Sequence, residues 1–237
     1  MCQEAVRKLC NPSESCHVRK VARLLARPLS LKPFEPRFRE HLRELGHNRL
    51  PDGLKGKADD LFEIYVREAL GFVFGERVVR YGQERLFETR PDGLVLPSQG
   101  FYALYDAKAY ADGYRVTQDS LRQFGSYVKD FSKRYGTYLQ RLNSFLVVSG
   151  KFAQGDKALD ERSREFIAEH QVPLSFVTAD ALGDMIEILS ETPVVRRAVN
   201  WSRVFSDPVA QPSLVRSEIS TVSRDKTIGR VQRGNLG

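Results

Sequence analysis

Apolar residues recur every three or four positions in several segments of the chain, a spacing that places them on one face of a helix. In 117–140, for example, Leu121, Phe124 and Val128 share a face, and the apolar-rich segment 58–74 is followed by Gly75, a common helix end. The pattern predicts helices over 18–25, 37–45, 58–74, 117–140, 156–170 and 179–189.

Shorter apolar runs between these helices predict strands. Residues 93–96 and 101–105 flank Pro97-Ser98-Gln99-Gly100, whose composition is typical of a hairpin turn. The run 145–149 is almost continuously apolar, as in a strand that is covered on both faces. The remaining predicted strands are 78–81 and 174–177. Helices and strands that alternate in this way predict an α/β sandwich built on a mixed sheet.

Breaker residues divide the chain into three predicted regions. Pro51-Asp52-Gly53 and Gly56 separate a basic helical extension, 1–57, from a core over 58–190. The third region, 191–237, is rich in Arg, Ser, Pro and Gly and is predicted to be a basic, partly ordered tail.

Two expectations concern the regions outside the core. The helix over 37–45 carries one apolar stripe and is expected to pack on a neighbour, with a helix-turn-helix DNA reader as the alternative. In the C-terminal region we expect Trp201 and Phe205 to dock on the core, and the chain beyond Ser206 to be weakly ordered.

The composition is that of a globular protein, with 237 residues of which 41% are hydrophobic and 28% charged. No apolar run approaches the roughly 18 residues of a membrane span, and no apolar signal core is seen, so we expect a cytoplasmic protein that does not enter membranes. Cys2, Cys10 and Cys16 are therefore expected to be free thiols, with a zinc site that includes His17 as the alternative.

The charge is distributed unevenly along the chain. The formal net charge is +7, but residues 1–57 carry 13 Lys and Arg against 6 acidic residues, and 191–237 carry 8 against 4. Residues 58–190 carry 16 against 20 and are slightly acidic. Basic flanks favour a polyanionic partner, and they are the regions expected to contact the phosphates of double-stranded DNA.

The candidate chemistry lies where two predicted strands meet. Asp92 precedes one strand, and Asp106 and Lys108 follow the next, with Asp106 fourteen positions after Asp92. Side chains alternate along a strand, so Asp106 and Lys108 project from one face while Ala107 turns away. A hairpin register that puts Asp92 opposite Asp106 brings two carboxylates to one ion, and oxygen ligands favour magnesium or manganese over zinc. An acid-x-lysine triplet occurs by chance more than once in such a chain, so the spacing and the strand context carry this prediction.

The segments around this motif extend the pattern. They are Leu61-Phe62-Glu63-Ile64-Tyr65-Val66-Arg67-Glu68, Pro91-Asp92-Gly93, Asp106-Ala107-Lys108-Ala109-Tyr110-Ala111-Asp112-Gly113-Tyr114, Tyr127-Val128 and Phe145-Leu146-Val147-Val148-Ser149-Gly150-Lys151-Phe152. Together they closely resemble the cleavage domain of the FokI-type (type IIS) restriction endonucleases, a family of the PD-(D/E)XK nuclease superfamily. The resemblance runs from about residue 58 to about residue 190. It implies a restriction-endonuclease-like core, in which a mixed β-sheet is flanked by helices.

The resemblance also implies roles for five residues. Asp92 and Asp106 would ligate Mg²⁺, for which Mn²⁺ can substitute, and the carbonyl of Ala107 would be a further ligand. Lys108 would position the attacking water, help to deprotonate it and stabilise the charge that develops on the phosphate. Glu63, on the helix face that carries Val66 and Leu70, would support a second metal or orient Lys108, with an acid on the surface as the alternative.

Two departures from the family pattern bear on assembly. FokI-type domains dimerise through a helix whose Asp and Arg, four residues apart, pair across the two-fold axis, and Arg122 and Ser126 stand at those positions here. We therefore expect a monomer in free solution that pairs on DNA or with a second nuclease subunit. The 57 residues before the core are also too few for a large DNA-recognition region. Three possibilities follow: a cleavage subunit recruited by a separate recognition subunit, a compact stand-alone nuclease, or a fragment of a longer protein.

These observations predict a metal-dependent DNA endonuclease that hydrolyses phosphodiester bonds as the cleavage subunit or domain of a restriction or defence system. One alternative is a transposon-end or recombination nuclease of the same superfamily that acts within a complex. Another is a non-catalytic DNA-binding protein on this fold, which the intact Asp92, Asp106 and Lys108 disfavour.

Overall fold

The computed structural model describes residues 36–75, 77–80, 90–96, 101–136, 142–191, 196 and 198–222. All of them belong to one compact unit, 34–237. The predicted helix 18–25, the turn 97–100 and the three cysteines with His17 lie outside the described residues, as does the tail beyond 222.

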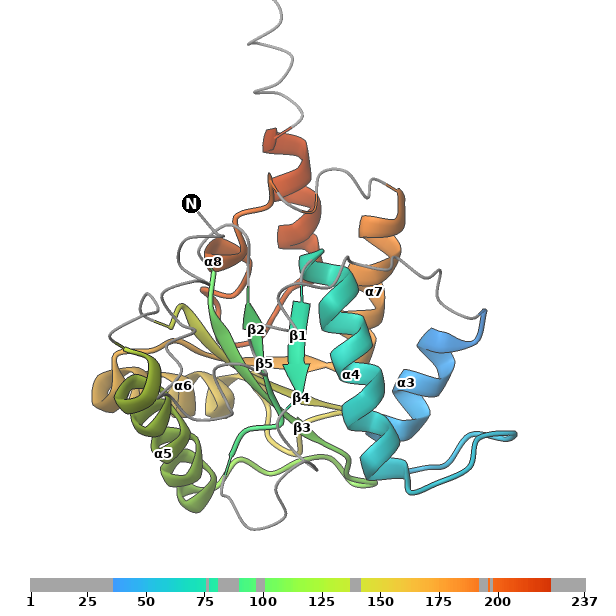
Figure 1. The fold of residues 1–237 in the computed structure, drawn as a ribbon, viewed down its shortest axis with the longest axis horizontal. Coiled ribbons are helices and arrows are strands. Elements are labelled where there is room, and N and C mark those ends of the chain that lie inside the picture. Colours follow the sequence, from blue (N-terminus) through green and yellow to red (C-terminus); the bar gives the residue numbers. More distant parts are fainter. Residues whose placement is uncertain are drawn as a thin grey trace, which may run out of the picture. The chain divides into compact units, whose positions relative to one another are not determined.

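A five-stranded mixed sheet forms the centre of this unit (Figure 1). Its strands are β1 (Arg77–Arg80), β2 (Gly93–Leu96), β3 (Ala103–Lys108), β4 (Ser144–Ser149) and β5 (Leu174–Thr178), which lie side by side in that order. The first three are antiparallel neighbours, whereas β3, β4 and β5 are parallel. Every residue of β4 is buried, as its apolar sequence predicts. The α/β class with a mixed sheet is confirmed.

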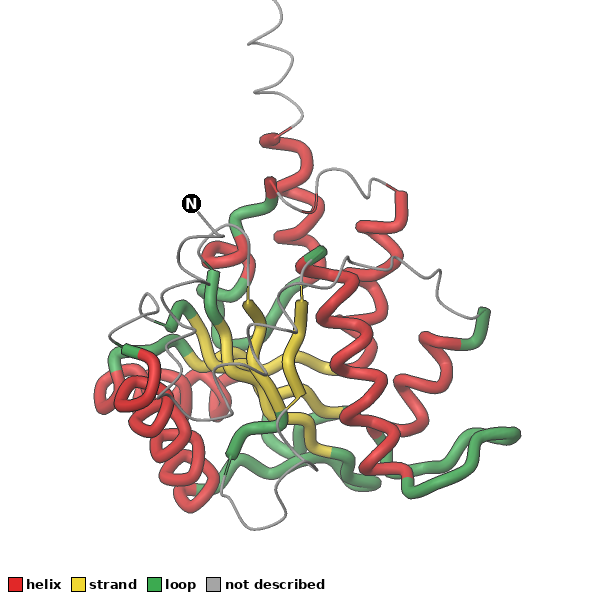
Figure 2. The backbone as a smooth tube through the Cα atoms, in the orientation of Figure 1, coloured by secondary structure: helices red, strands yellow, loops and turns green. Residues whose placement is uncertain are grey.

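Helices cover both faces of the sheet (Figure 2). On one face lie α3 (Phe38–Gly46), α4 (Ala58–Phe74) and α7 (Ala179–Glu191), which share a hydrophobic core with Ala103, Tyr105 and Ala107 of β3. On the other face lie α5 (Gln118–Tyr135) and α6 (Asp156–His170), whose aromatic rings pack on Phe145 of β4. Alternate residues of β3, including Asp106 and Lys108, therefore face α5.

Helix α3 packs along α4 and α7, as its apolar stripe predicts. Phe38, Leu42 and Leu45 are buried in the same core, and Arg39 on the outer side pairs with Asp184 and Glu187 of α7. The part of the N-terminal region that follows residue 35 thus shares the core of the sheet domain.

The C-terminal region differs from the expectation of weak order beyond Ser206. Trp201, which begins α8 (Trp201–Val204), and Phe205 pack on Phe74, which confirms that they dock on the core. The chain then continues along β5, where Phe176 donates to the carbonyl of Pro208 and accepts from the N–H of Ala210, and a helix follows over 212–222.

The expectation was wrong for 207–222 because the edge of β5 needs backbone partners, which this segment supplies. The helix over 212–222 is anchored by Val215, which is fully buried, and by Glu218, which pairs with Arg203 at 3.0 Å. One valine and one acid in a polar segment are a weak signal in the sequence, but each has a specific place in the fold.

Two element ends also differ from the predicted ones. Strand β3 covers 103–108 rather than 101–105, so Asp106 and Lys108 lie within the strand instead of after it. Helix α5 ends at Tyr135, and Thr117 forms its N-cap in a reciprocal capping box with Ser120. Among the residues that the structure describes, no helix is both long enough and apolar enough to cross a membrane.

Candidate active site

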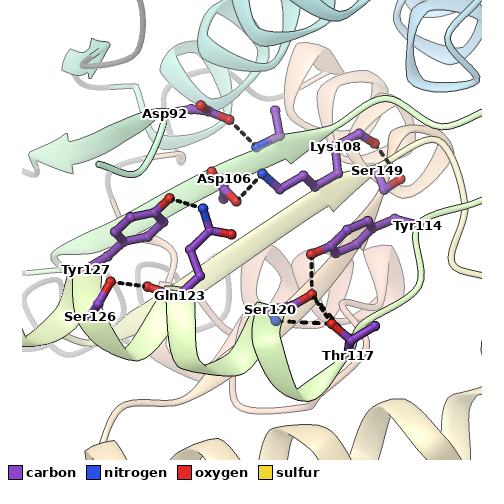
Figure 3. A network of polar contacts seen from close by, with 11 residues as sticks. Asp92, Asp106, Lys108, Tyr114, Thr117, Ser120, Gln123, Ser126, Tyr127 and Ser149 are labelled. Carbon is purple, nitrogen blue, oxygen red and sulfur yellow. Dashed lines mark hydrogen bonds and ion pairs between the residues drawn. The ribbon is translucent and has the colours of Figure 1, made fainter. Parts of the chain in front are cut away.

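The β2–β3 register brings the two aspartates together, as the hairpin prediction required. Gly93 pairs with Tyr105, so the residue before Gly93 comes opposite Asp106. Asp92 accepts a hydrogen bond of 2.6 Å from the backbone N–H of Ala107 to its Oδ2 (Figure 3). This bond holds the Asp92 carboxylate beside β3. Asp92 itself is the last residue before β2.

Asp106 and Lys108 form an ion pair on the face of β3 that looks toward α5. The Lys108 Nζ lies 2.7 Å from Oδ2 of Asp106, whose side chain is 2% exposed. Burial opposes the charge on Lys108, but the charge and hydrogen bonding of Asp106 outweigh it, so the pKa of Lys108 is raised. Lys108 is therefore a cation that can donate hydrogen bonds, rather than a free amine, when these carboxylates are its only neighbours.

Strand β4 holds the other edge of this segment. Lys108 pairs with Ser149 in the parallel register, and the Ser149 hydroxyl donates a 2.6 Å hydrogen bond to the carbonyl of Lys108. Since the carbonyls of successive residues point to opposite edges of a strand, the carbonyl of Ala107 points toward Asp92. The predicted third ligand is thus on the same side as the two aspartates.

The negative charges of the site repel one another. Burial raises the pKa of Asp92 well above its usual range, and the charges of Asp106 and Glu63 raise it further, against the opposing effects of the Ala107 N–H and Lys108. Glu63 lies half-buried on α4, on the opposite side of the sheet from Lys108, and is close enough to act on Asp92. Glu63 is thus an acid of α4 whose charge acts on Asp92.

A divalent cation would offset this repulsion. In the described part of the chain, no three His, Cys, Asp or Glu side chains come close enough together to hold a metal. The donors that fit an ion are the carboxylates of Asp92 and Asp106 and the carbonyl of Ala107, all of them oxygens. This set suits Mg²⁺ or Mn²⁺, which keep several water ligands.

Two residues of α5 that the sequence analysis did not assign to the site lie over it. The ring of Tyr127 points from α5 toward Asp106 and Lys108, and its hydroxyl accepts a 2.6 Å hydrogen bond from Gln123 (Figure 3). Burial and the charge of Asp106 raise the pKa of Tyr127 to about 12. In the sequence, Tyr127 stands in one of the segments that resemble the family, and Gln123 lies four residues before it on the same helix.

The positions that correspond to the dimerisation pair lie on the outer face of α5. Arg122 is 78% exposed and pairs with Asp119 of its own helix at 2.9 Å, while the Ser126 hydroxyl donates to the carbonyl of Gln123. Neither side chain is part of the acidic site.

A mixed sheet with two aspartates and a lysine at the meeting of β2 and β3, covered by helices on both faces, defines the class as a nuclease-type cleavage domain. The sequence matches the family of the FokI cleavage domain over residues 20–206, most of its length. The chain belongs to this family, which confirms the resemblance seen in the sequence and extends it beyond 58–190 at both ends.

Solved structures show the same fold. The restriction endonuclease FokI bound to DNA matches with a TM-score of 0.57 and 19% identity over 84% of this chain, and a second structure of the restriction endonuclease FokI matches equally well. This chain spans about a third (34–35%) of the length of those FokI chains. No curated protein sequence matches the chain.

Proposed function

We propose that this protein is a metal-dependent DNA endonuclease, the cleavage subunit or domain of a restriction or defence system. The single observation that carries the proposal is the joining of Asp92, Asp106 and Lys108 at one point, by the β2–β3 register and a 2.7 Å ion pair. Membership of the FokI cleavage-domain family supports the same function.

In this proposal each residue has a separate task. Asp92 and Asp106, with the carbonyl of Ala107, hold Mg²⁺, which when bound lowers the pKa of a water ligand and offsets charge on the phosphate. Lys108 holds the attacking water and donates a hydrogen bond to the phosphate as negative charge develops there. Ser149 and the N–H of Ala107 keep β3 and Asp92 in place for this chemistry. Glu63 modulates the charge of Asp92 from the far side.

The partner is double-stranded DNA, and its recognition needs more than this domain. The FokI bound to DNA has a chain about three times as long as the part matched here, since the match covers 34% of it. We infer that a separate recognition subunit or a further domain selects the DNA site, and that the basic flanks of the chain supply phosphate contacts. Each domain has one such centre, so cleavage of both strands requires two copies or two successive events.

The test is an assay of DNA cleavage with Mg²⁺, with EDTA, and with the variants Asp92→Ala, Asp106→Ala and Lys108→Ala. We expect cleavage only with the metal, and a loss of at least about 10³-fold in each variant. Asp207→Ala, which removes an exposed acid outside the site, is the control and should cleave like wild type. Full activity in Asp106→Ala would contradict the proposal.

A further inference from the structure

The hydroxyl of Tyr127 points from α5 toward the Asp106–Lys108 pair (Figure 3). Tyr127 is 4% exposed, and its ring stacks on Phe145 of β4 at a centroid distance of 6.3 Å. The close view shows this hydroxyl on the same face of the sheet as the side chains of Asp106 and Lys108 (Figure 3). The ring is thus fixed by packing, with its polar end in the site.

The hydrogen bond from Gln123 determines which part of this hydroxyl remains available. The side-chain amide nitrogen of Gln123 donates to the Tyr127 oxygen at 2.6 Å, which uses a lone pair and leaves the O–H proton. Within the described ranges, no hydrogen bond takes up that proton. Because the Tyr127 oxygen accepts from Gln123, its O–H proton points away from Gln123 and can be donated to another group.

The hydroxyl of Tyr114 is a donor inside the fold, whereas that of Tyr127 is an acceptor. The two tyrosines therefore differ in whether the hydroxyl proton is already used. Tyr114 follows β3 and also lies near Lys108, but its hydroxyl donates a 2.8 Å hydrogen bond to Ser120 in the capping box of α5. Its proton is used inside the fold to join the loop after β3 to α5. Only the Tyr127 proton, of these two, is left to a ligand.

A pocket borders the Tyr127 ring, with Pro91 and Leu104 on the sheet side and Asp130 and Phe131 on α5. Pro91 directly precedes Asp92 in the chain. A phenol stays protonated, and is therefore a hydrogen-bond donor, at neutral pH.

We propose that the Tyr127 hydroxyl donates a hydrogen bond to a non-bridging oxygen of the phosphate that is cleaved at Asp92 and Asp106, and that Gln123 orients this hydroxyl. Tyr127 is then a catalytic residue, and Gln123 a positioning residue that acts through it. The inference rests on the proposed nuclease function and adds a donor opposite Lys108. A donor aimed at an oxygen whose charge grows in the transition state acts on the rate more than on DNA affinity.

The experiment measures single-turnover cleavage of duplex DNA in Mg²⁺, DNA affinity in Ca²⁺ and the melting temperature Tm for four variants. Tyr127→Phe should lower the cleavage rate about 100-fold and leave the affinity within about twofold. Gln123→Leu should lower it less, and the double variant should be no slower than Tyr127→Phe, because both changes remove one interaction. Tyr114→Phe, which also loses a buried phenol hydroxyl, should lower Tm yet cleave within about twofold of wild type.

Three outcomes would overturn the inference. In the first, Tyr127→Phe cleaves at the wild-type rate. In the second, Tyr127→Phe and Tyr114→Phe lose activity equally and in proportion to the loss of Tm. In the third, the effects of Gln123→Leu and Tyr127→Phe on the rate are additive. If wild-type protein, with any recognition partner, does not cleave DNA at all, the proposed function fails and this inference falls with it. If wild-type protein cleaves DNA and Tyr127→Phe cleaves it at the same rate, the inference fails and the proposed function stands.

Discussion

Asp92 is the residue whose chemistry the fold changes most. Its carboxylate feels the charges of Asp106 and Glu63, and its raised pKa is opposed by the N–H of Ala107 and the ammonium of Lys108. Repulsion between like charges therefore destabilises the metal-free site, and a bound cation would reduce this repulsion. This makes metal binding measurable as stability as well as activity.

At this scale, Asp92→Asn should stabilise the metal-free protein and abolish its stabilisation by Mg²⁺. The amide oxygen can still accept from the Ala107 N–H, while one negative charge is removed. We expect the Tm of the metal-free variant to rise by about 2–4 °C, the shift produced by ~1 kcal/mol in a protein of this size. Thermal unfolding with and without Mg²⁺ measures both effects, with Asp207→Asn as the control. A wild-type Tm indifferent to Mg²⁺ would count against a metal site here.

Single residues could be predicted from the sequence only where a local motif carried them. Asp92, Asp106 and Lys108 lie on one hairpin, so spacing and alternation were enough to place them on one side of β3. Ser149 and Tyr127 reach the same point from β4 and α5. Their positions depend on the parallel register of β4 and on the way α5 lies across the sheet. Neither of these can be predicted from a short stretch of sequence.

Between elements, the backbone of Gly46, at the end of α3, lies close against the backbone of Gly150, after β4. A Cβ atom added at Gly150 would lie 2.4 Å from the carbonyl carbon and oxygen of Gly46. Gly46 also accepts a hydrogen bond from the N–H of Tyr110, two residues after Lys108. This contact therefore ties the end of α3 to the loops that follow β3 and β4.

Gly150→Ser should lower the free energy of unfolding by about 1–3 kcal/mol or more, because two backbones must separate to admit the side chain. Gly155→Ser is the matched control, since a Cβ there meets no atom within 4 Å and serine is a good N-cap for α6. Urea denaturation compares the two variants. Equal stabilities would show that the close approach is not maintained in solution.

The packing of α6 on α5 predicts a dependence on pH. The His170 ring is 4% exposed and lies against the backbone of Gly125, and this burial lowers its pKa, with Glu169 opposing and Lys129 reinforcing the shift. As pH falls below about 6.5, the unfolded state takes up a proton before the folded state does, so the free energy of unfolding decreases. The stability difference between wild type and His170→Gln should shrink from pH 7 to pH 5. A difference independent of pH would contradict a buried neutral His170.

Periodicity was sufficient to predict most elements, and tertiary contacts decided the rest. Helices α3, α4, α6 and α7 and strands β4 and β5 lie where the apolar patterns place them. The segment 207–222 could not be predicted, because its backbone bonds to Phe176 depend on an exposed edge of β5 that exists only in the folded sheet.

In the molecule as a whole, the outer face of α5 argues against self-association in the FokI manner. Arg122 is exposed and already paired with Asp119, so two copies docked through α5 would gain no reciprocal ion pair. Exposed pairs contribute only about 0–1 kcal/mol each, so this difference tips a weak dimer without forbidding one. Sedimentation equilibrium at micromolar concentration should show a monomer without DNA. A tight dimer that Lys129→Glu, a change on the exposed face of α5, disrupts would show this prediction wrong.

The central claim is that Asp92, Asp106 and Lys108 direct water at a phosphodiester. The most direct measurement is cleavage of duplex DNA in ¹⁸O-labelled water with Mg²⁺, followed by mass spectrometry of the terminal phosphates. Direct attack by water forms one new P–O bond and breaks the bond to the leaving oxygen, so each new phosphate should carry one ¹⁸O atom. Asp106→Asn should form no product. Unlabelled phosphates at the cleaved ends, or labelled product from Asp106→Asn at the wild-type rate, would contradict the account.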